Sequence, residues 1–433
     1  MKVAGILWGL VLAAIVLLAG CGGSDNNYWL LGQGKKIQGD QGLNVTNFQP
    51  ASVVIGQATF TAYSSSGVGI EGNRPVAAYT IDEPYGDPAF GNGIFYVPDY
   101  GSNRVLGFSG IPATNGASAA FVLGQSNVFS SGSGTGAGQM NGPLTARYAN
   151  GKLLVADYAN SRVLIWNTAP TTSGAPADVV VGQTGFGSGG GGASQTQLYE
   201  PEDMIVVGNK LIVADTGNNR VLIWNSIPTT NGAPADVVLG QNDFTHKTAN
   251  DDNQDGIYDT TPTARTLSFP VGLWSDGTRL IVCDAENNRV LIWNTIPTSN
   301  FAPANLVLGQ SDFTHFAYND DNQDGTADAT PTARTFNLPY FVTSNGTQFF
   351  VVDYYNNRVL MWNSIPTANF TPADRVLGQG DFTHNAANDD NQDGTTDAAP
   401  TGRTLFYPSG IFIYGNQLFV MDASNNRLLI FDF

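Results

Sequence analysis

The sequence is poor in cysteine, histidine and charge. It contains two cysteines and three histidines among 433 residues, and 13% of its residues are charged. Cys21 lies at the end of the N-terminal apolar run, so Cys283 has no partner for an intrachain disulfide. Cys283 takes the slot that Ala holds in related Val-Ala-Asp segments, which favours a small buried residue over a reactive thiol. The chain also lacks a Cys-x-x-Cys-His haem motif, a nucleophile elbow and a phosphate loop.

Helical periodicity and positive charge are scarce as well. No long segment has the apolar spacing of an amphipathic helix, whereas glycine is abundant with 51 residues. This composition predicts many short strands joined by turns. The net charge of −17 argues against nucleic-acid binding, which needs a basic face. Beyond residue 48 the chain still has 385 residues, too many for one ordinary core, which predicts several domains or a repeat.

The N-terminus reads as an export signal. Lys2 is followed by an uninterrupted apolar run over 3–18, which ends in Leu18-Ala19-Gly20-Cys21. A basic start, a short apolar stretch and a small-residue cleavage site predict a secretory signal peptide over 1–20. The run is short for a membrane span. Leu-Ala-Gly-Cys resembles the bacterial lipobox, which implies lipidation of Cys21. The alternative is an ordinary cleaved signal with an incidental cysteine.

Lipidation would anchor the exported chain to a membrane, because each buried CH₂ group contributes about 0.8 kcal/mol. Gly22 stands where an Asp would suggest retention at the inner membrane, so the resemblance implies the outer membrane or the cell surface. Residues 21–48 are rich in Gly, Asn, Gln and Ser and are predicted to form a flexible, lipid-anchored tether.

One unit recurs six times in the rest of the chain. Each copy has an Asp-x-x-x-x-Arg segment, a hydrophobic run that ends in Gly-Gln, and a proline 14 residues before the Asp (15 in the first copy). The aspartates are Asp99, Asp157, Asp215, Asp284, Asp353 and Asp422, and the arginines are Arg104, Arg162, Arg220, Arg289, Arg358 and Arg427. The glutamines are Gln57, Gln125, Gln183, Gln241, Gln310 and Gln379, and the prolines are Pro84, Pro143, Pro201, Pro270, Pro339 and Pro408. Only the connection from Gly-Gln to the next proline varies in length, so the unit is rigid and tolerates insertions at one point.

The unit reads as four short strands. In the fourth copy these cover 271–274, 279–283, 289–293 and 305–309, with a tight turn at Asp276-Gly277 between the first two. Runs such as Val-Leu-Ile-Trp suit strands that are covered on both faces. A repeated four-stranded unit is typical of a propeller blade. We therefore predict an all-β, six-bladed β-propeller over 49–433.

The ends of the repeat predict how the ring closes. The sixth copy ends at Phe433, after its third strand, while 51–57 looks like an outer strand without a blade. The N-terminal strand can complete the C-terminal blade, which leaves no open sheet edge to aggregate.

The consensus Val-Ala-Asp-x-x-Asn-Asn-Arg-Val-Leu-Ile-Trp resembles the NHL repeat, and the similarity covers essentially all of 49–433. This resemblance implies a six-bladed propeller. Its relatives include bacterial surface proteins, regulatory proteins and a few enzymes, so it implies little about function.

The recurring residues are predicted to be structural. Asp and Arg can oppose each other across the hairpin as an ion pair worth about 0.2–1 kcal/mol, and a ligand role is the alternative. A stripe of equivalent aromatic residues is predicted to pack between blades, with a sugar-binding platform as the minor alternative. The stripe consists of Phe108, Trp166, Trp224, Trp293, Trp362 and Phe431.

Three insertions repeat the acidic pattern Asp-x-Asn-x-Asp-Gly-x-x-Asp, which is similar to the first nine positions of an EF-hand calcium loop and to thrombospondin type 3 motifs. The predicted Ca²⁺ ligands are Asp251, Asn253, Asp255 and Asp259, then Asp320, Asn322, Asp324 and Asp328, then Asp389, Asn391, Asp393 and Asp397. The glutamate expected at position 12 is replaced by proline, so affinity is expected in the weak range of about 10⁻⁴–10⁻³ M. The alternative is an Asx-rich surface loop that binds nothing.

Each of the three histidines, His246, His315 and His384, precedes one of these loops by five residues. Because they belong to separate blades, a local capping role is favoured over a shared zinc site. Loops from strand two to three and from strand four to the next blade emerge on one face of a propeller. The acidic loops and the Asp-x-x-x-x-Arg turns should therefore share a face, which is the first candidate for partner binding.

Two classes of function remain open. The first is a non-enzymatic binding or scaffold lipoprotein of the cell envelope, a monomeric propeller that engages a protein or glycan. The second is a hydrolase or lyase with a metal near the central axis, similar to calcium-dependent lactonases or to the amidating lyase with an NHL-like ring. The polar residues recur symmetrically, which favours binding and assigns no catalytic residue. Glu202 and Asp203 are the chief asymmetry near the start of an inner strand.

Overall fold

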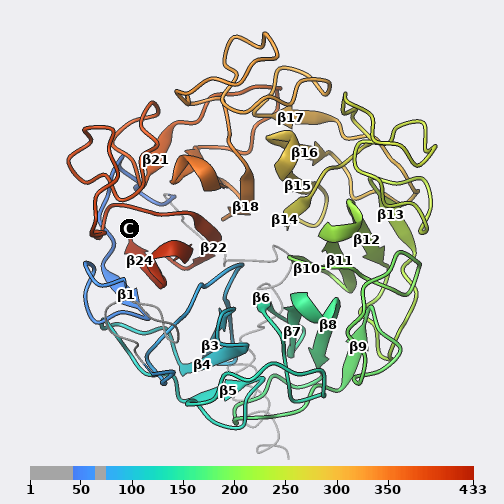
Figure 1. Cartoon of the computed structure of the whole chain (residues 1–433), viewed down its shortest axis with the longest axis vertical. Helices are drawn as coiled ribbons and strands as arrows, with labels where there is room; N and C mark the ends of the chain where they lie inside the picture. Colours follow the sequence, from blue (N-terminus) through green and yellow to red (C-terminus); the bar gives the residue numbers. More distant parts are fainter. Residues whose placement is uncertain (1–41, 64–74) are drawn as a thin grey trace, which may run out of the picture.

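The computed structural model describes residues 42–63 and 75–433. The predicted signal peptide, Cys21 and most of the predicted tether lie outside these residues. The strands form six four-stranded antiparallel sheets, which are arranged as blades around a central axis, with the first strand of each blade innermost (Figure 1). The predicted all-β, six-bladed propeller is confirmed.

The blades follow the six repeats in order. Blade 1 contains β2 (Ala89–Gly91), β3 (Ile94–Asp99), β4 (Arg104–Ser109) and β5 (Phe121–Leu123). Blade 2 contains β6 (Pro143–Ala149), β7 (Lys152–Asp157), β8 (Arg162–Trp166) and β9 (Val179–Val181). Blade 3 contains β10 (Met204–Val207), β11 (Lys210–Asp215), β12 (Arg220–Trp224) and β13 (Val237–Leu239). Blade 4 contains β14 (Pro270–Ser275), β15 (Leu280–Asp284), β16 (Arg289–Trp293) and β17 (Leu306–Leu308). Blade 5 contains β18 (Pro339–Ser344), β19 (Phe349–Asp353), β20 (Arg358–Trp362) and β21 (Arg375–Leu377).

Blade 6 joins the two ends of the described chain. It contains β22 (Pro408–Tyr414), β23 (Gln417–Asp422), β24 (Arg427–Asp432) and the N-terminal strand β1 (Val53–Ile55). β1 pairs antiparallel with β24, and Val54 lies opposite Leu429. The predicted closure is confirmed, because the outer edge of the last blade is covered by the first strand.

Residues 42–48 belong to the predicted tether, and they pack against the ring. Leu43 and Val45 are buried. The backbone N–H of Leu43 donates to Oε1 of Gln348 at 2.6 Å, and the Gln348 side chain donates back to the Leu43 carbonyl at 2.8 Å. This end of the segment is therefore held on blade 5.

The aromatic stripe packs between blades, as predicted. Trp224 is 3% exposed and belongs to a cluster that includes Leu154 and Ile165 of the preceding blade. Phe431 of blade 6 packs in the same way with Phe350 and other residues of blade 5. Each blade thus fills the wedge that separates it from the blade before, which fixes the ring.

The Asp–Arg pairs lie inside the protein, and each is paired across the hairpin as predicted. In blade 3, Nε of Arg220 lies 2.6 Å from Oδ2 of Asp215, and both side chains are fully buried. Arg220 also donates to the carbonyls of Ser194 and Gln197 at 2.9 and 3.0 Å, while Oδ1 of Asp215 accepts the N–H of Tyr199 at 2.6 Å. Because all these groups are desolvated, losing one partner costs several kcal/mol rather than the fraction expected for an exposed pair.

The residue before each arginine links neighbouring blades. Asn219 has a φ of 52°, a left-handed conformation that asparagine tolerates better than most residues. Its side-chain oxygen accepts the N–H of Phe269 in the next blade at 2.8 Å, and its carbonyl accepts the side chain of Gln241 at 3.1 Å. The recurring Asn and Arg side chains and the N–H groups of the Gln amides are therefore bonded within the scaffold, while Oε1 of Gln241, Gln310 and Gln379 is buried without a partner. No helix in the two described ranges is both long enough and apolar enough to cross a membrane.

Candidate functional site

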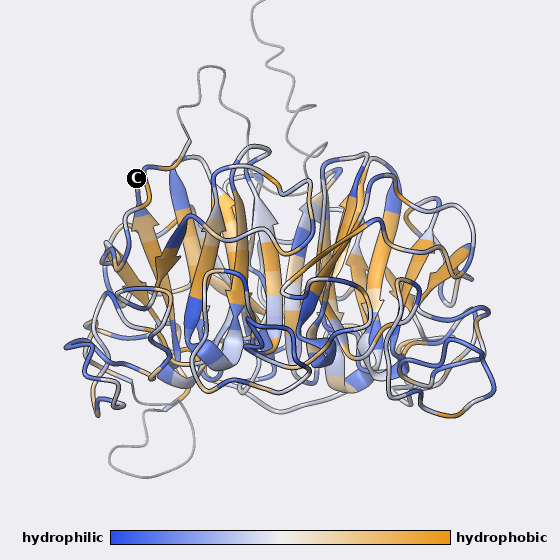
Figure 2. Cartoon of the chain, turned by 90° about the horizontal axis from the view of Figure 1, so that it is seen from above, coloured by the Kyte–Doolittle hydropathy of each residue, from blue (hydrophilic) through white to orange (hydrophobic). Residues whose placement is uncertain are grey.

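One face of the ring carries both the turns between strands two and three and the long connections between blades (Figure 2); we call it the turn face. Blades 2–6 each place a single 3₁₀ turn there. These turns are η2 (Tyr158–Asn160), η3 (Thr216–Asn218), η4 (Ala285–Asn287), η5 (Tyr354–Asn356) and η6 (Ala423–Asn425). The amides of Asn250 and Asn287 exchange two hydrogen bonds of 2.9 and 2.8 Å, which ties the first acidic insertion to η4. The acidic loops and the turns share this face, as expected.

Near the axis on the turn face lies a group of residues that break the sixfold pattern. The recurring proline stands at or a few residues before the start of an inner strand, and the residue after it is Glu202 in blade 3 and Tyr340 in blade 5. The Tyr340 hydroxyl donates a hydrogen bond to the Glu202 carboxyl, although blade 4 stands between their blades. Tyr85 of blade 1 and Tyr354 of blade 5 are joined by their hydroxyls at 3.3 Å. Contacts between blades that are not neighbours place these side chains close to the axis.

Tyrosine rings continue this group in both directions. Tyr85 packs edge-on against Tyr100 with ring centroids 5.5 Å apart, and Tyr100 lies 6.3 Å from Tyr158. On the other side, Tyr354 contacts Tyr340 and stacks on Tyr407, each at a centroid distance of 4.9 Å. The six tyrosines and Glu202 form what we call the axial cluster, to which blades 1, 2, 3, 5 and 6 contribute.

Glu202 is the polar centre of the axial cluster. It is 2% exposed, and its Oε2 atom has no hydrogen-bond partner. Burial raises the pKa of Glu202 to about 8, although the hydrogen bond from Tyr340 lowers it. The carboxyl is therefore mostly protonated at neutral pH, and one of its oxygens has unused bonding capacity. Buried acids with raised pKa values are typical of functional sites.

A second buried group lies beside it at the axis. The guanidinium of Arg147 bridges Oδ2 of Asp87 at 2.7 Å and Oδ1 of Asp203 at 2.8 Å. Asp203 also accepts the backbone N–H of Leu273 at 2.8 Å, and Asp87 accepts that of Ile411 at 2.6 Å. These contacts join five blades, so the geometry suits a clamp for the inner strands. Burial raises the pKa of Asp203 to about 7, opposed by Arg147.

The sequence pointed to Glu202 and Asp203 but to none of their partners. Arg147, Asp87 and Tyr340 lie far apart in the chain and look like ordinary strand residues. Their one sequence signal is that each breaks the sixfold pattern within a few residues of a recurring proline. The axial cluster was therefore detectable only in part.

The pKa of Glu202 predicts a pH-dependent stability. Between its ordinary value of 4.5 and about 8, the folded protein holds a proton that the unfolded chain releases. Stability from this group is therefore fully present below pH 4.5 and is lost as pH rises through 8, by roughly 3–5 kcal/mol. Glu202→Gln should unfold at a higher temperature than the wild type at pH 8.5, with a much smaller difference at pH 5. Thermal melts at both values test this, with Glu83→Gln, an exposed residue on the same face, as control. Equal differences at both pH values would contradict it.

The predicted calcium ligands lie at the rim of the turn face. In the first loop the carboxylate of Asp251 accepts the backbone N–H groups of Asp255 and Gly256 at 3.0 and 2.8 Å. Asp259 accepts the N–H of Asp252 at 3.0 Å. The second and third loops repeat these closing bonds through Asp320 and Asp389. Within 42–63 and 75–433, no three His, Cys, Asp or Glu side chains are grouped so that they could hold a metal ion. Calcium binding stays a prediction.

Each histidine pairs within its own loop. Nδ1 of His246 lies 2.8 Å from Oδ1 of Asp243, and His315 and His384 make the same contact with Asp312 and Asp381. These are short-range contacts three residues apart. The local role favoured from the sequence is what the contacts show.

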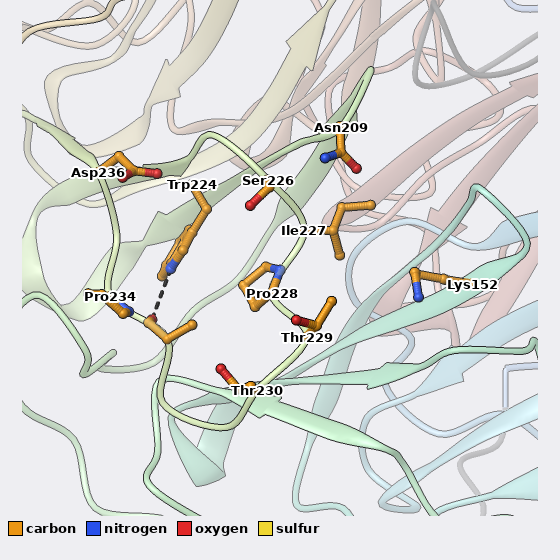
Figure 3. Close-up of a pocket in the computed structure, with 11 residues that line it drawn as sticks. Lys152, Asn209, Trp224, Ser226, Ile227, Pro228, Thr229, Thr230, Pro234 and Asp236 are labelled. Atoms are coloured by element: carbon orange, nitrogen blue, oxygen red, sulfur yellow. Dashed lines mark hydrogen bonds between the residues drawn. The ribbon is translucent and has the colours of Figure 1, made fainter.

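The opposite face carries a cavity of about 450 Å³ between blades 2 and 3 (Figure 3). Trp224 lines it and donates from Nε1 to the carbonyl of Ala233 at 3.0 Å. Lys152, Ser226 and Thr229 add polar groups. It is a second surface on which a ligand could be held, and it contains no buried acid.

No protein-family model matches the sequence, and no curated protein matches it. Three solved structures of similar fold are the PQQ-bound aldose sugar dehydrogenase of Streptomyces coelicolor, virginiamycin B lyase of Staphylococcus aureus and an auxiliary nutrient binding protein of Bacteroides thetaiotaomicron. The dehydrogenase is 15% identical, with a TM-score of 0.40 over 82% of this chain and 96% of its own. The lyase is 12% identical, with a TM-score of 0.38 over 83% and 97%. The nutrient binding protein is 12% identical, with a TM-score of 0.45 over 86% and 75%. Two of these three proteins are enzymes and one is a binding protein, and no function is assigned to this chain from them.

Proposed function

We propose that this chain is a non-enzymatic binding protein of the cell envelope, anchored through lipid on Cys21, which holds its ligand on the turn face. The NHL-type repeats would serve as its scaffold. The observation that supports this proposal is that repeated and non-repeated polar residues lie in different places. The repeated Asp, Arg and Asn side chains and the Gln amide N–H groups are bonded inside the scaffold, where Oε1 of Gln241, Gln310 and Gln379 is buried without a partner. The residues that differ between blades gather at the axis of the turn face as the axial cluster.

Exposed aromatic residues extend the proposed binding surface outward from the axis. Tyr199 and Tyr355 are 41% and 47% exposed and lie beside the cluster, with Tyr355 in ring contact with Tyr354 and Tyr407. Aromatic side chains that remain exposed next to a buried polar centre are typical of recognition surfaces.

A capture experiment tests the proposed face. The immobilised protein should retain a ligand from envelope extracts, and the double variant Tyr199→Ser with Tyr355→Ser should lose most of it. Ser226→Arg, which fills the cavity of the opposite face, should retain the wild-type amount. Loss of capture by Ser226→Arg alone would move the binding site to the opposite face and refute the proposal.

We further propose that calcium stabilises the acidic loops at the rim. The loops already bend so that backbone N–H groups converge on Asp251, and Asp255 and Asn253 remain exposed for an incoming ion. Calorimetric titration with calcium should give dissociation constants in the millimolar range. The Asp251→Asn variant should lose about one third of the binding sites of the wild type. The capture experiment with and without calcium then shows whether the ion matters for binding. No heat at millimolar calcium would leave the loops as plain Asx-rich turns.

One observation favours a second candidate, a hydrolase or lyase at the axis. Glu202 is a buried acid that holds its proton at neutral pH and is oriented by Tyr340, as a general acid requires. The metal that similar enzymes use has no grouped set of three ligands among the described residues. An axial enzyme would lose turnover in Glu202→Gln while its ligand affinity stayed near wild type.

A further inference from the structure

We infer that the axial cluster is a site for a primary ammonium group, which is bound between tyrosine rings and donates a hydrogen bond to Oε2 of Glu202. The inference rests on the proposed function, because it names the ligand chemistry of the same face. The ammonium group could belong to a free aliphatic amine or to a lysine side chain, because both carry the same charged group.

The unpartnered oxygen of Glu202 calls for a donor once the carboxyl has lost its proton. The carboxyl accepts one hydrogen bond from Tyr340, and Oε2 is buried with no partner, an unfavourable state that a donor relieves when the carboxyl is ionised. No residue of the described chain supplies that donor. The neighbouring Tyr85 and Tyr354 hydroxyls bond to each other. A ligand that brings an N–H group to this point satisfies the carboxyl.

The charges around Glu202 favour a cation over a neutral donor. Glu200 accepts a hydrogen bond from the Tyr158 hydroxyl, and the negative charge of Glu83 acts on the Tyr85 and Tyr100 hydroxyls. The charged groups that act on Glu202 are Glu200 and Asp203. Aromatic faces attract ammonium groups through the negative charge of their π-electrons. Arg147, the basic residue beside the cluster, is paired with Asp87 and Asp203, so the remaining acid and the aromatic faces form a cation site.

Amine binding should draw the proton off Glu202. The groups that face it are Glu200, Asp203 and Tyr340, with Tyr85, Tyr100 and Tyr158 around them. An ammonium ion favours the carboxylate form, so affinity should rise between pH 7 and pH 9, where an aliphatic amine stays charged. Proton release appears as a binding enthalpy that depends on the buffer.

The test is calorimetry of the full chain with putrescine, with 1,4-butanediol as the uncharged probe of similar shape, and with N-acetyl-lysine methylamide as the lysine probe. Putrescine should bind at least tenfold more tightly than the diol, and its enthalpy should differ between phosphate and Tris buffers. Glu202→Gln should weaken putrescine at least tenfold, whereas Glu286→Gln, an exposed glutamate on η4, should change it less than twofold. Comparison of the two amines identifies the source of the ammonium group.

Equal binding of putrescine and diol, or binding of neither, overturns the inference even if Glu202→Gln fails to fold. Preference for a neutral sugar over every amine overturns it too. If amines fail while capture still depends on Tyr199 and Tyr355, the inference falls and the proposed function stands. If amines bind as expected but the Tyr199 and Tyr355 substitutions do not reduce capture, the ammonium site is supported and the proposed envelope-binding function is refuted.

Discussion

Deleting Ala51–Gln57 should lower the free energy of unfolding by roughly 5–9 kcal/mol. β1 supplies Val53, Val54 and Ile55 to the last blade, and they are 8%, 0% and 0% exposed. Burying each such side chain contributes about 1.5–3 kcal/mol. The deletion also exposes the edge of β24 and removes Gln57, whose side chain donates to the Asn426 carbonyl at 3.0 Å. At this chain length the midpoint of thermal unfolding should fall by roughly 6–11 °C.

Calorimetric melts of the deletion and of a point variant check the closure. Val54→Asp places a charge in the buried core that blades 5 and 6 share, and it should reproduce most of the loss. Ala58→Asp, at an exposed position just past the strand, should melt close to the wild type. An unchanged melting temperature in the deletion variant would mean that the ring does not depend on β1.

Arg220→Met should cost about 3–5 kcal/mol of stability. The substitution keeps the length of the side chain but leaves Asp215 buried without its cation. It also strips hydrogen bonds from the carbonyls of Ser194, Gln197 and Phe244. Burial already raises the pKa of Asp215, and loss of the guanidinium removes the main opposing influence, so Asp215 would take up a proton.

The chain offers a matched control for this substitution. Arg265 pairs with Asp252 at 3.4 Å, but both side chains are partly exposed, at 46% and 30%. Arg265→Met should therefore cost less than about 1 kcal/mol. Chemical denaturation of both variants measures the difference. The double variant Asp215→Leu with Arg220→Met should recover part of the loss, because no charge is left buried. Similar losses for Arg220→Met and Arg265→Met would contradict a desolvated pair.

Repetition made the fold readable from the sequence. Six copies in register averaged out the uncertainty of any one strand, so that β16 was predicted at its observed bounds and β14, β15 and β17 within one to two residues. Closure was predictable because a missing outer strand in the sixth copy and a spare strand at 51–57 leave one way to avoid an open edge. The pairing of Asp with Arg followed from their positions on either side of a turn.

Burial was the first property that the sequence did not supply. An Asp–Arg pair beside a turn has the pattern of an exposed ion pair. Arg220 is nevertheless fully buried, because the connections between blades place the carbonyls of Ser194, Gln197 and Phe244 on its guanidinium. The same holds for 42–48, whose composition suggests a tether although Leu43 and Val45 are buried against the ring.

The sequence by itself determined the repeat, the number of blades and the latch, because each depends on local strand pattern and on counting. Tertiary structure decided the candidate site. Glu202, Tyr340, Tyr85 and Tyr158 come from four blades and are up to 255 residues apart. They meet only because ring closure brings the segments around the starts of the inner strands, and the turn η2 that carries Tyr158, to one axis. The carboxyl of Glu202 then loses its water and leaves one oxygen unsatisfied, a property that no local pattern could have revealed.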